Sequence, residues 1–336
     1  MKYTVMGRTG LRVSKLCLGT FNFGERNDEK EAFRIMDAAL DAGITFFDTA
    51  NEYGGDGHRG LSEEIIGNWF VSRGTRRKIV LATKVYSIAE DPDDGPNEDH
   101  CLSTFKIRRH LENSLRRLKT DHIELYQMHH VDRSVSWDEL YDVFASLFYQ
   151  GKFDYLGASN FAGWDLMEAQ AKAKERHFLG IVCDQEKYNL LSRLPELELL
   201  PAAEHCGMGV ITYSPLNYGM LAGERLKTGA NSRRDFLKTE LPKYQQYWTN
   251  EVRLLEARMS EYSQLCADIG ASEACVALAW IMSNPVVTAP IIGPRTLEQF
   301  EALLPAVELK LSDDVLKKLD ELFPGPGGSA PEAYAW

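Results

Sequence analysis

The feature of this sequence that most constrains its fold is a repeated alternation between short apolar runs and longer segments whose apolar residues follow a helical spacing. Within 29–42, the apolar residues recur at i, i+3, i+4, i+7 and i+8, as in a helix with one buried face. The strands are predicted at 15–18, 44–47, 78–84, 122–128, 154–159, 180–184, 209–214 and 286–292. The helices are predicted at 29–42, 61–70, 105–118, 137–148, 164–174, 195–205, 252–268 with 273–282, and 297–304.

This alternation predicts parallel strands with helices outside them. Eight such units in 336 residues favour a closed (β/α)8 TIM barrel, formed by the whole chain, 1–336, as a single domain. An open doubly wound sheet would normally carry a nucleotide fingerprint after its first strand. The glycines of 55–60 match G-x-G-x-x-G, but they follow the second strand at a distance and lack a suitable acid near residue 80. We therefore interpret 55–60 as a flexible loop.

Three segments lie outside the repeating pattern. Residues 3–14 alternate around 7–10 and predict an N-terminal β-hairpin before the barrel. The long polar stretch 217–250 after the seventh strand exceeds a plain connection, so we expect a lid over a ligand. The end of the chain, 324–336, begins with a Pro- and Gly-rich run and is expected to be a flexible tail.

Composition excludes several classes of function. The net charge of −11 argues against a surface that binds nucleic acid or an anionic membrane, and the basic runs 73–78 and 106–109 are interpreted as solvated faces. Six cysteines without a C-x-x-C pair predict reduced, mostly buried thiols. The start lacks the apolar run of a signal peptide, and no stretch of 18 apolar residues occurs. We expect a cytoplasmic protein with a small-molecule partner, while homo-oligomer formation stays open.

Four chemically active side chains fall where a barrel of this type builds its active site, at the carboxyl ends of its strands. These are Asp48, Tyr53, Lys84 and His129. Each also has a structural explanation, since an aspartate can cap a helix, a lysine can lie on the surface and a histidine can be bonded in the core. A metal site is not expected, because His129 and the adjacent His130 point to opposite faces of a strand.

Together the four residues make chemical sense as a proton-transfer site. A phenol with a pKa of about 10 is a poor acid at neutral pH unless a cation stabilises its phenolate. The ammonium of Lys84 is expected to lower the pKa of Tyr53, with Asp48 keeping Lys84 charged and oriented. His129 can hydrogen-bond a substrate carbonyl. Tyr53 would then be the general acid in reduction and the general base in the reverse direction.

The chain resembles the aldo/keto reductases over essentially its full length. The resemblance rests on FDTA at 47–50 with YG at 53–54, TK at 83–84, YQMHHVD at 126–132, GASNF at 157–161, QEKYNL at 185–190, YSPL at 213–216 and IGPRT at 292–296. It implies that Asp48, Tyr53, Lys84 and His129 form the catalytic tetrad of that family.

The resemblance also implies a nicotinamide dinucleotide bound without a Rossmann domain. Ser159, Asn160 and Gln185 would bond the carboxamide, and Tyr213 would stack on the ring. An arginine at the adenosine end, Arg295, would favour NADPH over NADH; a surface guanidinium is the less favoured alternative for this residue. The remaining expected cofactor contacts are Gly19, Thr20, Asp48, Ser214, Leu216, Gly219, Arg225, Gly293 and Gln299.

Two positions depart from the family pattern. Glu224 stands where a pyrophosphate-binding lysine is often found, so Arg225 or another residue must neutralise the pyrophosphate. Leu303 stands where an asparagine often faces the adenine, which puts that contact in doubt.

Within the family, the chain is similar to actinomycete reductases of dTDP-keto-deoxysugars, through HHVDR at 129–133 with WDE at 137–139, LPAA at 200–203 and GPRT at 293–296. A nucleotide sugar would suit a roomy lid and cationic side chains near the mouth. Packing in the core or lid explains the aromatic candidates for the substrate wall equally well. The expected substrate contacts are Phe21, Asn22, Phe23, Tyr53, Tyr86, His129 and Trp248.

Two other functions compete with NADPH-dependent reduction of an aldehyde or ketone. Potassium-channel β subunits resemble the same fold and tetrad, so a cofactor-sensing regulatory subunit with slow turnover is an alternative. A barrel enzyme without redox chemistry is the third. The sequence does not identify the carbonyl substrate or the stereochemistry, because substrate choice depends on loops.

Overall fold

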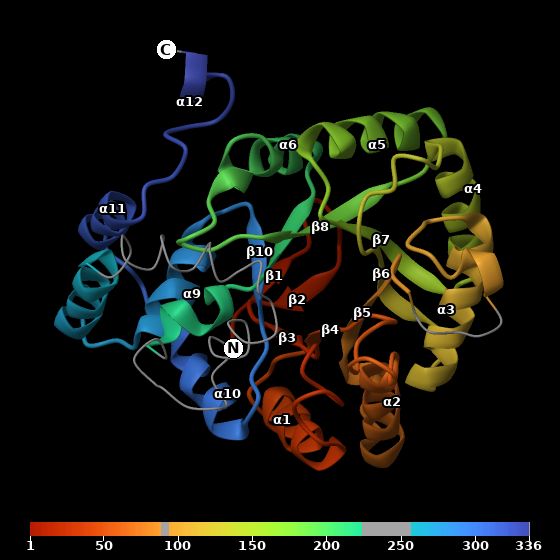
Figure 1. The fold of residues 1–336 in the computed structure, drawn as a ribbon, viewed down its shortest axis with the longest axis horizontal. Helices are drawn as coiled ribbons and strands as arrows, with labels where there is room; N and C mark the ends of the chain where they lie inside the picture. The colour runs from red at the N-terminus through yellow and green to blue at the C-terminus, as the bar shows by residue number, and fades with distance from the viewer. Residues whose placement is uncertain (89–93, 224–256, 336) are drawn as a thin grey trace.

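Eight parallel strands close into a barrel in this computed structural model, which describes residues 1–88, 94–223 and 257–335 (Figure 1). The predicted TIM barrel is therefore confirmed. Around the barrel the strands run in the order β10-β3-β4-β5-β6-β7-β8-β9. Their bounds are β3 (Cys17–Gly19), β4 (Phe46–Asp48), β5 (Val80–Val85), β6 (Ile123–Met128), β7 (Phe153–Ser159), β8 (Ile181–Lys187), β9 (Gly209–Tyr213) and β10 (Val287–Ile292).

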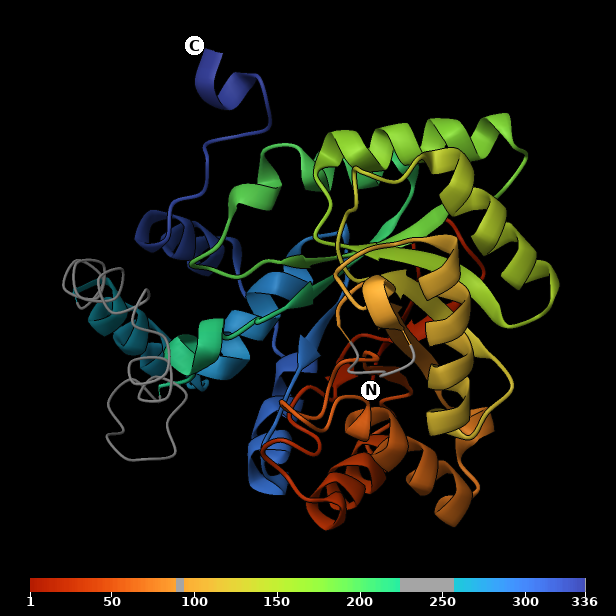
Figure 2. The same ribbon diagram turned by 45° about the vertical axis from the view of Figure 1, so that its right-hand side comes forward.

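The helices surround the strands, as Figures 1 and 2 show from two directions. A serine, threonine or aspartate side chain caps several of them, for example Ser103 before α3 and Ser136 before α4. Their bounds are α1 (Glu29–Asp41), α2 (Leu61–Arg73), α3 (Thr104–Leu118), α4 (Trp137–Tyr149), α5 (Gly163–Glu175), α6 (Leu199–Cys206), Ala257–Asp268, α9 (Glu273–Ser283), α10 (Leu297–Leu303), α11 (Asp313–Leu322) and α12 (Glu332–Ala335). Short 3-10 turns are η1 (Arg76–Lys78), η2 (Gly95–Asn97), η3 (Leu194–Glu196), η4 (Asn217–Ala222) and η6 (Leu304–Val307).

The predicted N-terminal hairpin is present and closes one end of the barrel. Its strands, β1 (Tyr3–Val5) and β2 (Arg12–Ser14), pair antiparallel. Met6 and Val13 are fully buried in the apolar cluster that fills the barrel interior. Gly7 has a left-handed φ of 52°, and a Cβ there would collide with the backbone of Gly207. A glycine is thus needed where the hairpin meets the turn before β9.

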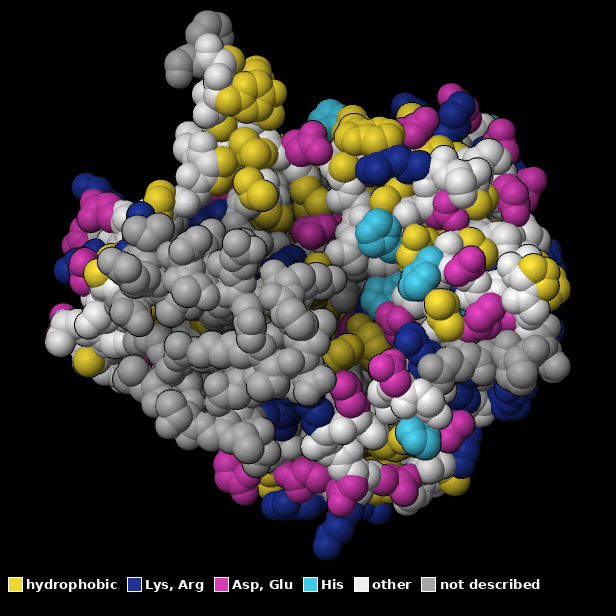
Figure 3. Space-filling view, viewed as in Figure 1, with side chains coloured by type: hydrophobic (Ala, Val, Ile, Leu, Met, Phe, Trp, Pro, Cys, Tyr) yellow, Lys and Arg dark blue, Asp and Glu magenta, His cyan; other side chains and the backbone are white. Residues whose placement is uncertain are grey.

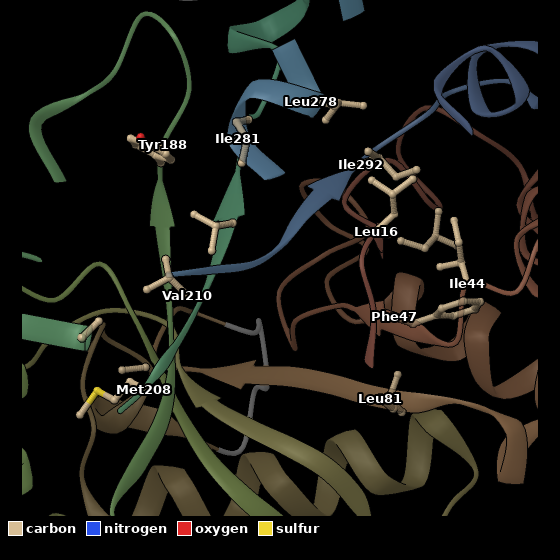
Figure 4. Packing of buried hydrophobic residues seen from close by; sticks show 14 of the residues in the cluster. Leu16, Ile44, Phe47, Leu81, Tyr188, Met208, Val210, Leu278, Ile281 and Ile292 are labelled. Atoms are coloured by element: carbon tan, nitrogen blue, oxygen red, sulfur yellow. The ribbon is translucent and has the colours of Figure 1, made fainter. Parts of the chain in front are cut away.

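A second, larger apolar cluster fills the layer between the strands and the helices. Leu16, Phe47, Leu81 and Ile292 extend from strands or strand ends toward this layer (Figure 4). Apolar residues on both faces are the mark of parallel strands covered by helices. The strand ends are therefore rigidly held, which allows side chains at the carboxyl ends to be positioned accurately.

The structure differs from the sequence prediction in several elements. The helix expected at 195–205 starts only at Leu199, because Glu198 has a non-helical φ of −140°. Helix α11 was not predicted, although Ser312 caps it and Leu319 and Leu322 bury one face. Residues 324–335 include α12, and the amide of Ala330 donates to Leu197 O; the flexibility of the tail stays a prediction. Most of the expected lid, from 224 onward, lies outside the described residues.

Two expectations from composition meet direct observations. All six cysteines are unpaired, and Cys17, Cys183, Cys266 and Cys275 are buried. In the parts of the chain that the structure describes, no single helix is long and apolar enough to cross a membrane. Among the described residues, one pair of helices meets that test together, Ala257–Asp268 with Glu273–Ser283, and these are bent by 89°.

One carboxyl group in β8 is buried without a hydrogen bond. Asp184 is 0% exposed, and neither of its carboxyl oxygens has a partner. Burial raises the pKa of Asp184 well above its usual value, and nearby Glu186 raises it further. A protonated carboxyl avoids placing an unpaired charge in the interior. The folded protein therefore holds a proton here that the unfolded chain releases above a pH of about 4.

We expect Asp184→Asn to stabilise the protein increasingly as the pH rises from 5 to 8. The folded state of the wild type binds more protons than the unfolded state in this range, so its stability falls with pH, and an amide removes that loss. The difference in stability between the two proteins should change by up to about 1.4 kcal/mol per pH unit, the linkage of one proton, measured by urea unfolding at several pH values. Asp154→Asn, on the exposed side of β7, is the matched control. Parallel pH profiles for the wild type and Asp184→Asn would contradict the prediction.

Candidate active site

The four predicted catalytic side chains meet at the carboxyl ends of β4, β5 and β6. Asp48 is the last residue of β4, Lys84 lies near the end of β5, and His129 follows β6 directly. Tyr53 lies on the loop after β4, with its ring 5.9 Å from that of His129. Figure 3 shows histidine side chains gathered with acidic and hydrophobic ones on the face where β6 ends. The structure thus brings together all four residues chosen from the sequence.

Lys84 is the centre of the hydrogen-bond network. Its Nζ atom is fully buried and donates to Asp48 Oδ2 at 2.6 Å, to Thr49 O at 2.8 Å and to Tyr53 OH at 3.2 Å. An ammonium has three protons to donate, and each has an acceptor here. This arrangement holds the cation at the phenol oxygen of Tyr53.

The other carboxylate oxygen of Asp48 is also bonded. Asp48 Oδ1 accepts hydrogen bonds from Gln127 Nε2 at 3.0 Å and Gln185 Nε2 at 2.9 Å. A buried ion pair is tolerated only when its remaining polar atoms are hydrogen-bonded in this way. The role of Gln127 was missed from the sequence. Its position two residues before His129, on the same face of a strand, could have identified it.

The electrostatics of the pair favour a charged lysine and a protonated tyrosine. Burial alone would lower the pKa of Lys84, but Asp48 and Tyr53 together raise it above its ordinary value. Burial raises the pKa of Tyr53 to about 12, and this outweighs the opposite effect of Lys84. The predicted net lowering of the Tyr53 pKa is therefore wrong. Lys84 acts in the predicted direction, but desolvation of the phenol is larger.

His129 is a neutral imidazole. Burial, Lys84 and His130 together hold the pKa of His129 well below its ordinary value. Its Nδ1 atom lies 3.1 Å from Glu52 Oε1 but has no hydrogen-bond partner among the described residues. Because the ring is neutral, we treat this contact as a close approach and not as an ion pair. A neutral imidazole still has one N–H group to donate to a carbonyl oxygen.

Beside the tetrad, the residues predicted to bind a nicotinamide lie together. Asn160 has a left-handed φ of 59°, and its Nδ2 donates to Ser159 Oγ at 2.9 Å and to His129 O at 3.1 Å. Tyr213 OH donates to Asn160 Oδ1 at 2.8 Å, and Ser159 Oγ donates to Gln185 O at 2.9 Å. These amides and the partly exposed phenol ring suit an aromatic carboxamide in their chemistry.

Other predicted cofactor residues lie near the ends of β3, β9 and β10. Ser214 and Leu216 lie just before the turn η4, and Gly219 lies within it. Ser214 and Gly219 have positive φ values of 50° and 87°. Thr20 is fully buried and donates to Asp48 O at 3.1 Å. A Cβ at Gly19 would lie 2.5 Å from Ile291 Cγ2, so close strand packing also requires glycine there. Arg225 lies outside the described residues.

At the start of α10, the expected adenosine contacts are tied to the barrel. Arg295 N donates to Gln299 Oε1 at 2.9 Å, and Asn27 Nδ2 donates to Arg295 O at 3.0 Å. Gly293 is exposed and its carbonyl accepts from Asn22 Nδ2 at 2.9 Å. Leu303 is 7% exposed and packs in the core. The leucine at this position therefore contributes to the apolar core.

The substrate-wall candidates separate into exposed and buried residues. Phe21 is 41% exposed and contacts Tyr53 edge-on at 5.1 Å. Tyr86 stacks on His130 at 5.3 Å. Phe23, in contrast, is fully buried in the core, so its assignment to the substrate wall is wrong. Asn22 is 3% exposed, and Trp248 lies outside the described residues.

The family is decided by a match between residues 15–323 and the model of the aldo/keto reductase family. The chain belongs to this family. It is 55% identical to the uncharacterized oxidoreductase YrpG of Bacillus subtilis over the full length of both chains. It is 30% identical to protein tas of Escherichia coli, covering 95% of this chain and 97% of that protein.

A further relative of this aldo/keto reductase is named a probable voltage-gated potassium channel subunit beta, from Oryza sativa subsp. japonica. It is 31% identical, over 95% of this chain and 96% of that protein. None of these relatives is named a dTDP-keto-deoxysugar reductase. The expected place in that actinomycete branch is therefore not supported, and membership stands at the level of the family.

Proposed function

We propose that this aldo/keto reductase uses NADPH to reduce an aldehyde or ketone to an alcohol, with Tyr53 as the general acid. The observation that carries the proposal is the hydrogen-bonded series from Asp48 through Lys84 to Tyr53. The bound nicotinamide would supply the hydride to the carbonyl carbon. The hydroxyl of Ser159 and the side-chain amides of Asn160 and Gln185, with the ring of Tyr213, are the groups that would hold it.

The protein's own residues then control the proton. Tyr53 is protonated at neutral pH, because its pKa is raised to about 12. As the carbonyl oxygen gains charge, it becomes an alkoxide, which is more basic than a phenolate, so the proton passes from Tyr53 OH to that oxygen. The Lys84 ammonium, 3.2 Å away, stabilises the phenolate that remains. His129 donates its N–H to the same carbonyl oxygen and orients it.

We leave the substrate at the level of an aldehyde or ketone. A nucleotide-linked sugar would need cationic groups for its two phosphates. Near the described part of the mouth, Arg59 contacts Glu52 and Asp56, and Arg133 makes two hydrogen bonds to Asp165. These pairings reduce the case for a diphosphate ligand.

Arg295→Ala is expected to weaken NADPH binding while leaving NADH binding unchanged. Loss of a charge-assisted contact to a 2′-phosphate should cost about 1–3 kcal/mol of NADPH affinity. Titrations of both nucleotides, followed by quenching of intrinsic fluorescence, test this. Arg116→Ala, an exposed arginine on α3, is the control. If neither nucleotide binds to the wild type, the proposed redox function is wrong; if both bind equally, only the NADPH preference is wrong.

A regulatory subunit of the potassium-channel β type is the second candidate, because one relative carries that name. Such a protein would bind NADPH tightly, turn over slowly with every carbonyl and co-purify with a membrane channel. Multiple turnovers per second with a small aldehyde would exclude it. We also propose a cytoplasmic location. Self-association is a separate proposal, which light scattering of the purified protein would test.

A further inference from the structure

One buried imidazole bridges two loops that lie beside the active site. His110 is on the inner face of α3 and is 1% exposed. Its Nε2 atom is 2.6 Å from Asp94 Oδ2, and its Nδ1 atom is 2.8 Å from Asn51 Nδ2. Asp94 and Asn51 are also buried. Residues 51, 94 and 110, which are far apart in the chain, thus form one hydrogen-bonded group outside the tetrad.

The chemistry of the partners fixes the tautomer of His110. An ionised carboxylate only accepts hydrogen bonds, so Nε2 must carry the proton that is shared with Asp94. In the neutral ring, Nδ1 is then an acceptor, which matches the amide nitrogen of Asn51. Burial lowers the pKa of His110, although Asp94 acts in the opposite direction. The ring therefore donates on one side and accepts on the other.

On the accepting side, the bridge reaches the loop that carries Tyr53. Asn51 precedes Tyr53 by two residues, and its backbone N donates to Lys84 O at 3.3 Å. The amide of Tyr53 donates to Ala50 O at 3.2 Å. The side chain of Asn51 is therefore an anchor of the short segment that holds the phenol against Lys84.

On the donating side, the bridge reaches a different part of the mouth. Asp94 lies in the segment 94–103, between β5 and α3, which is also held by Lys106, one helical turn before His110. Lys106 Nζ donates to Glu98 O at 3.0 Å and Asp99 O at 2.6 Å. In this segment the ring of His100 lies 5.6 Å from the ring of Tyr86, a residue of the proposed substrate wall.

We propose that His110 is a positioning residue for the reaction, holding the Tyr53 loop through Asn51 and the substrate-side segment 94–103 through Asp94. Its side chain is buried and would act through these two contacts. Its kinetic consequences rest on the proposed reductase function, but its effect on the two loops does not. The two ring nitrogens serve different loops, so the two functions can be separated by substitution.

Two amide substitutions each keep one half of the bridge. The amide of Asn lies close to the Nδ1 position, so His110→Asn keeps an acceptor for Asn51 and loses the bond to Asp94. The amide of Gln reaches the Nε2 position, so His110→Gln keeps a donor for Asp94 and loses the bond to Asn51. Asn51→Ala removes the same contact as His110→Gln without changing α3, and it serves as the second variant.

Hydrogen–deuterium exchange tests the bridge without reference to activity. We expect His110→Gln and Asn51→Ala to speed exchange about tenfold or more in 49–53, and His110→Asn to do so in 94–103. Tyr141→Phe is the control, because it removes a buried hydrogen bond from α4 to Ala169 O and joins neither loop. Equal exchange in both loops for both His110 variants, or uniform loosening like that of Tyr141→Phe, would overturn the inference.

Kinetics then separate the two roles. His110→Gln and Asn51→Ala are expected to lower kcat on the order of 10–100-fold at nearly constant KM, because Tyr53 is misplaced, whereas His110→Asn should mainly raise KM. The double variant His110→Gln with Asn51→Ala should lose no more kcat than either single variant, because both substitutions remove the same contact. If the wild type reduces carbonyls and kcat and KM change in the same way for all variants, the inference fails. If the wild type reduces no carbonyl, the proposed function fails and the exchange result alone decides on the bridge.

Discussion

Tyr53→Phe is expected to lower kcat for carbonyl reduction by about 10²–10⁴-fold, the usual contribution of a positioned general acid. The phenol is the acidic group that the site holds against a fixed cation, with Lys84 Nζ 3.2 Å from its oxygen. Removing the oxygen leaves the ring, so contacts of Tyr53 with Phe21 and His129 are kept. The variant should fold and bind NADPH like the wild type.

The measurement is NADPH oxidation at saturating aldehyde, followed at 340 nm, with NADPH affinity determined separately. Tyr149→Phe is the matched control, since it removes the hydroxyl of an exposed tyrosine at the end of α4. Wild-type turnover of Tyr53→Phe on every reducible substrate would refute the assignment. Loss of NADPH binding would instead show that the substitution had damaged the site more widely.

Lys84→Met is expected to destabilise the fold by about 3–5 kcal/mol and to abolish reduction. The methionine fills similar space, but the carboxylate of Asp48 then stays buried without its cation. The bonds from Gln127 and Gln185 remain, but they are to one oxygen and do not neutralise the charge. Urea unfolding at pH 7 measures the loss of stability.

The double variant Lys84→Met with Asp48→Asn distinguishes the cause. If the cost of Lys84→Met comes from an uncompensated charge, removing that charge should restore a large part of the stability, with activity still absent. An additive loss in the double variant would mean that packing, and not charge, determines the cost. An unchanged free energy of unfolding in Lys84→Met would contradict the proposed role of the buried pair.

The barrel and the tetrad could be predicted from the sequence because both depend on regular geometry. Parallel strands bring their carboxyl ends to one edge, so Asp48, Lys84 and His129 had to lie near one another once the strands were recognised. The same geometry places Gln127, which was missed, two residues before His129 on the same face of its strand. These residues are placed by periodicity, which a sequence displays directly.

The remainder depends on contacts between loops, which no periodic pattern describes. The raised pKa of Tyr53 reflects desolvation of the phenol by its surroundings, including Phe21 and His129. This effect of desolvation on the pKa is larger than the opposite effect of Lys84. Phe23 looked like its exposed neighbour Phe21, yet it is buried. The bridge at His110 joins residues 51 and 94, which lie on two irregular loops. In the sequence, a histidine on the apolar face of a helix does not indicate which residues it will contact.

The hydrogen bond from Gln185 to Asp48 has a consequence for the order in which the enzyme matures. Asp48 is on β4 and Gln185 is on β8, four strands further around a ring of eight. All four members of the tetrad lie within the first 129 residues. During synthesis these residues emerge early, but Asp48 lacks one of its two amide donors until β8 has been made and the ring has closed. The first half of the chain alone therefore has the catalytic groups without their final arrangement. The hydrogen bonds of Asp48 are complete only when β8 has joined the barrel.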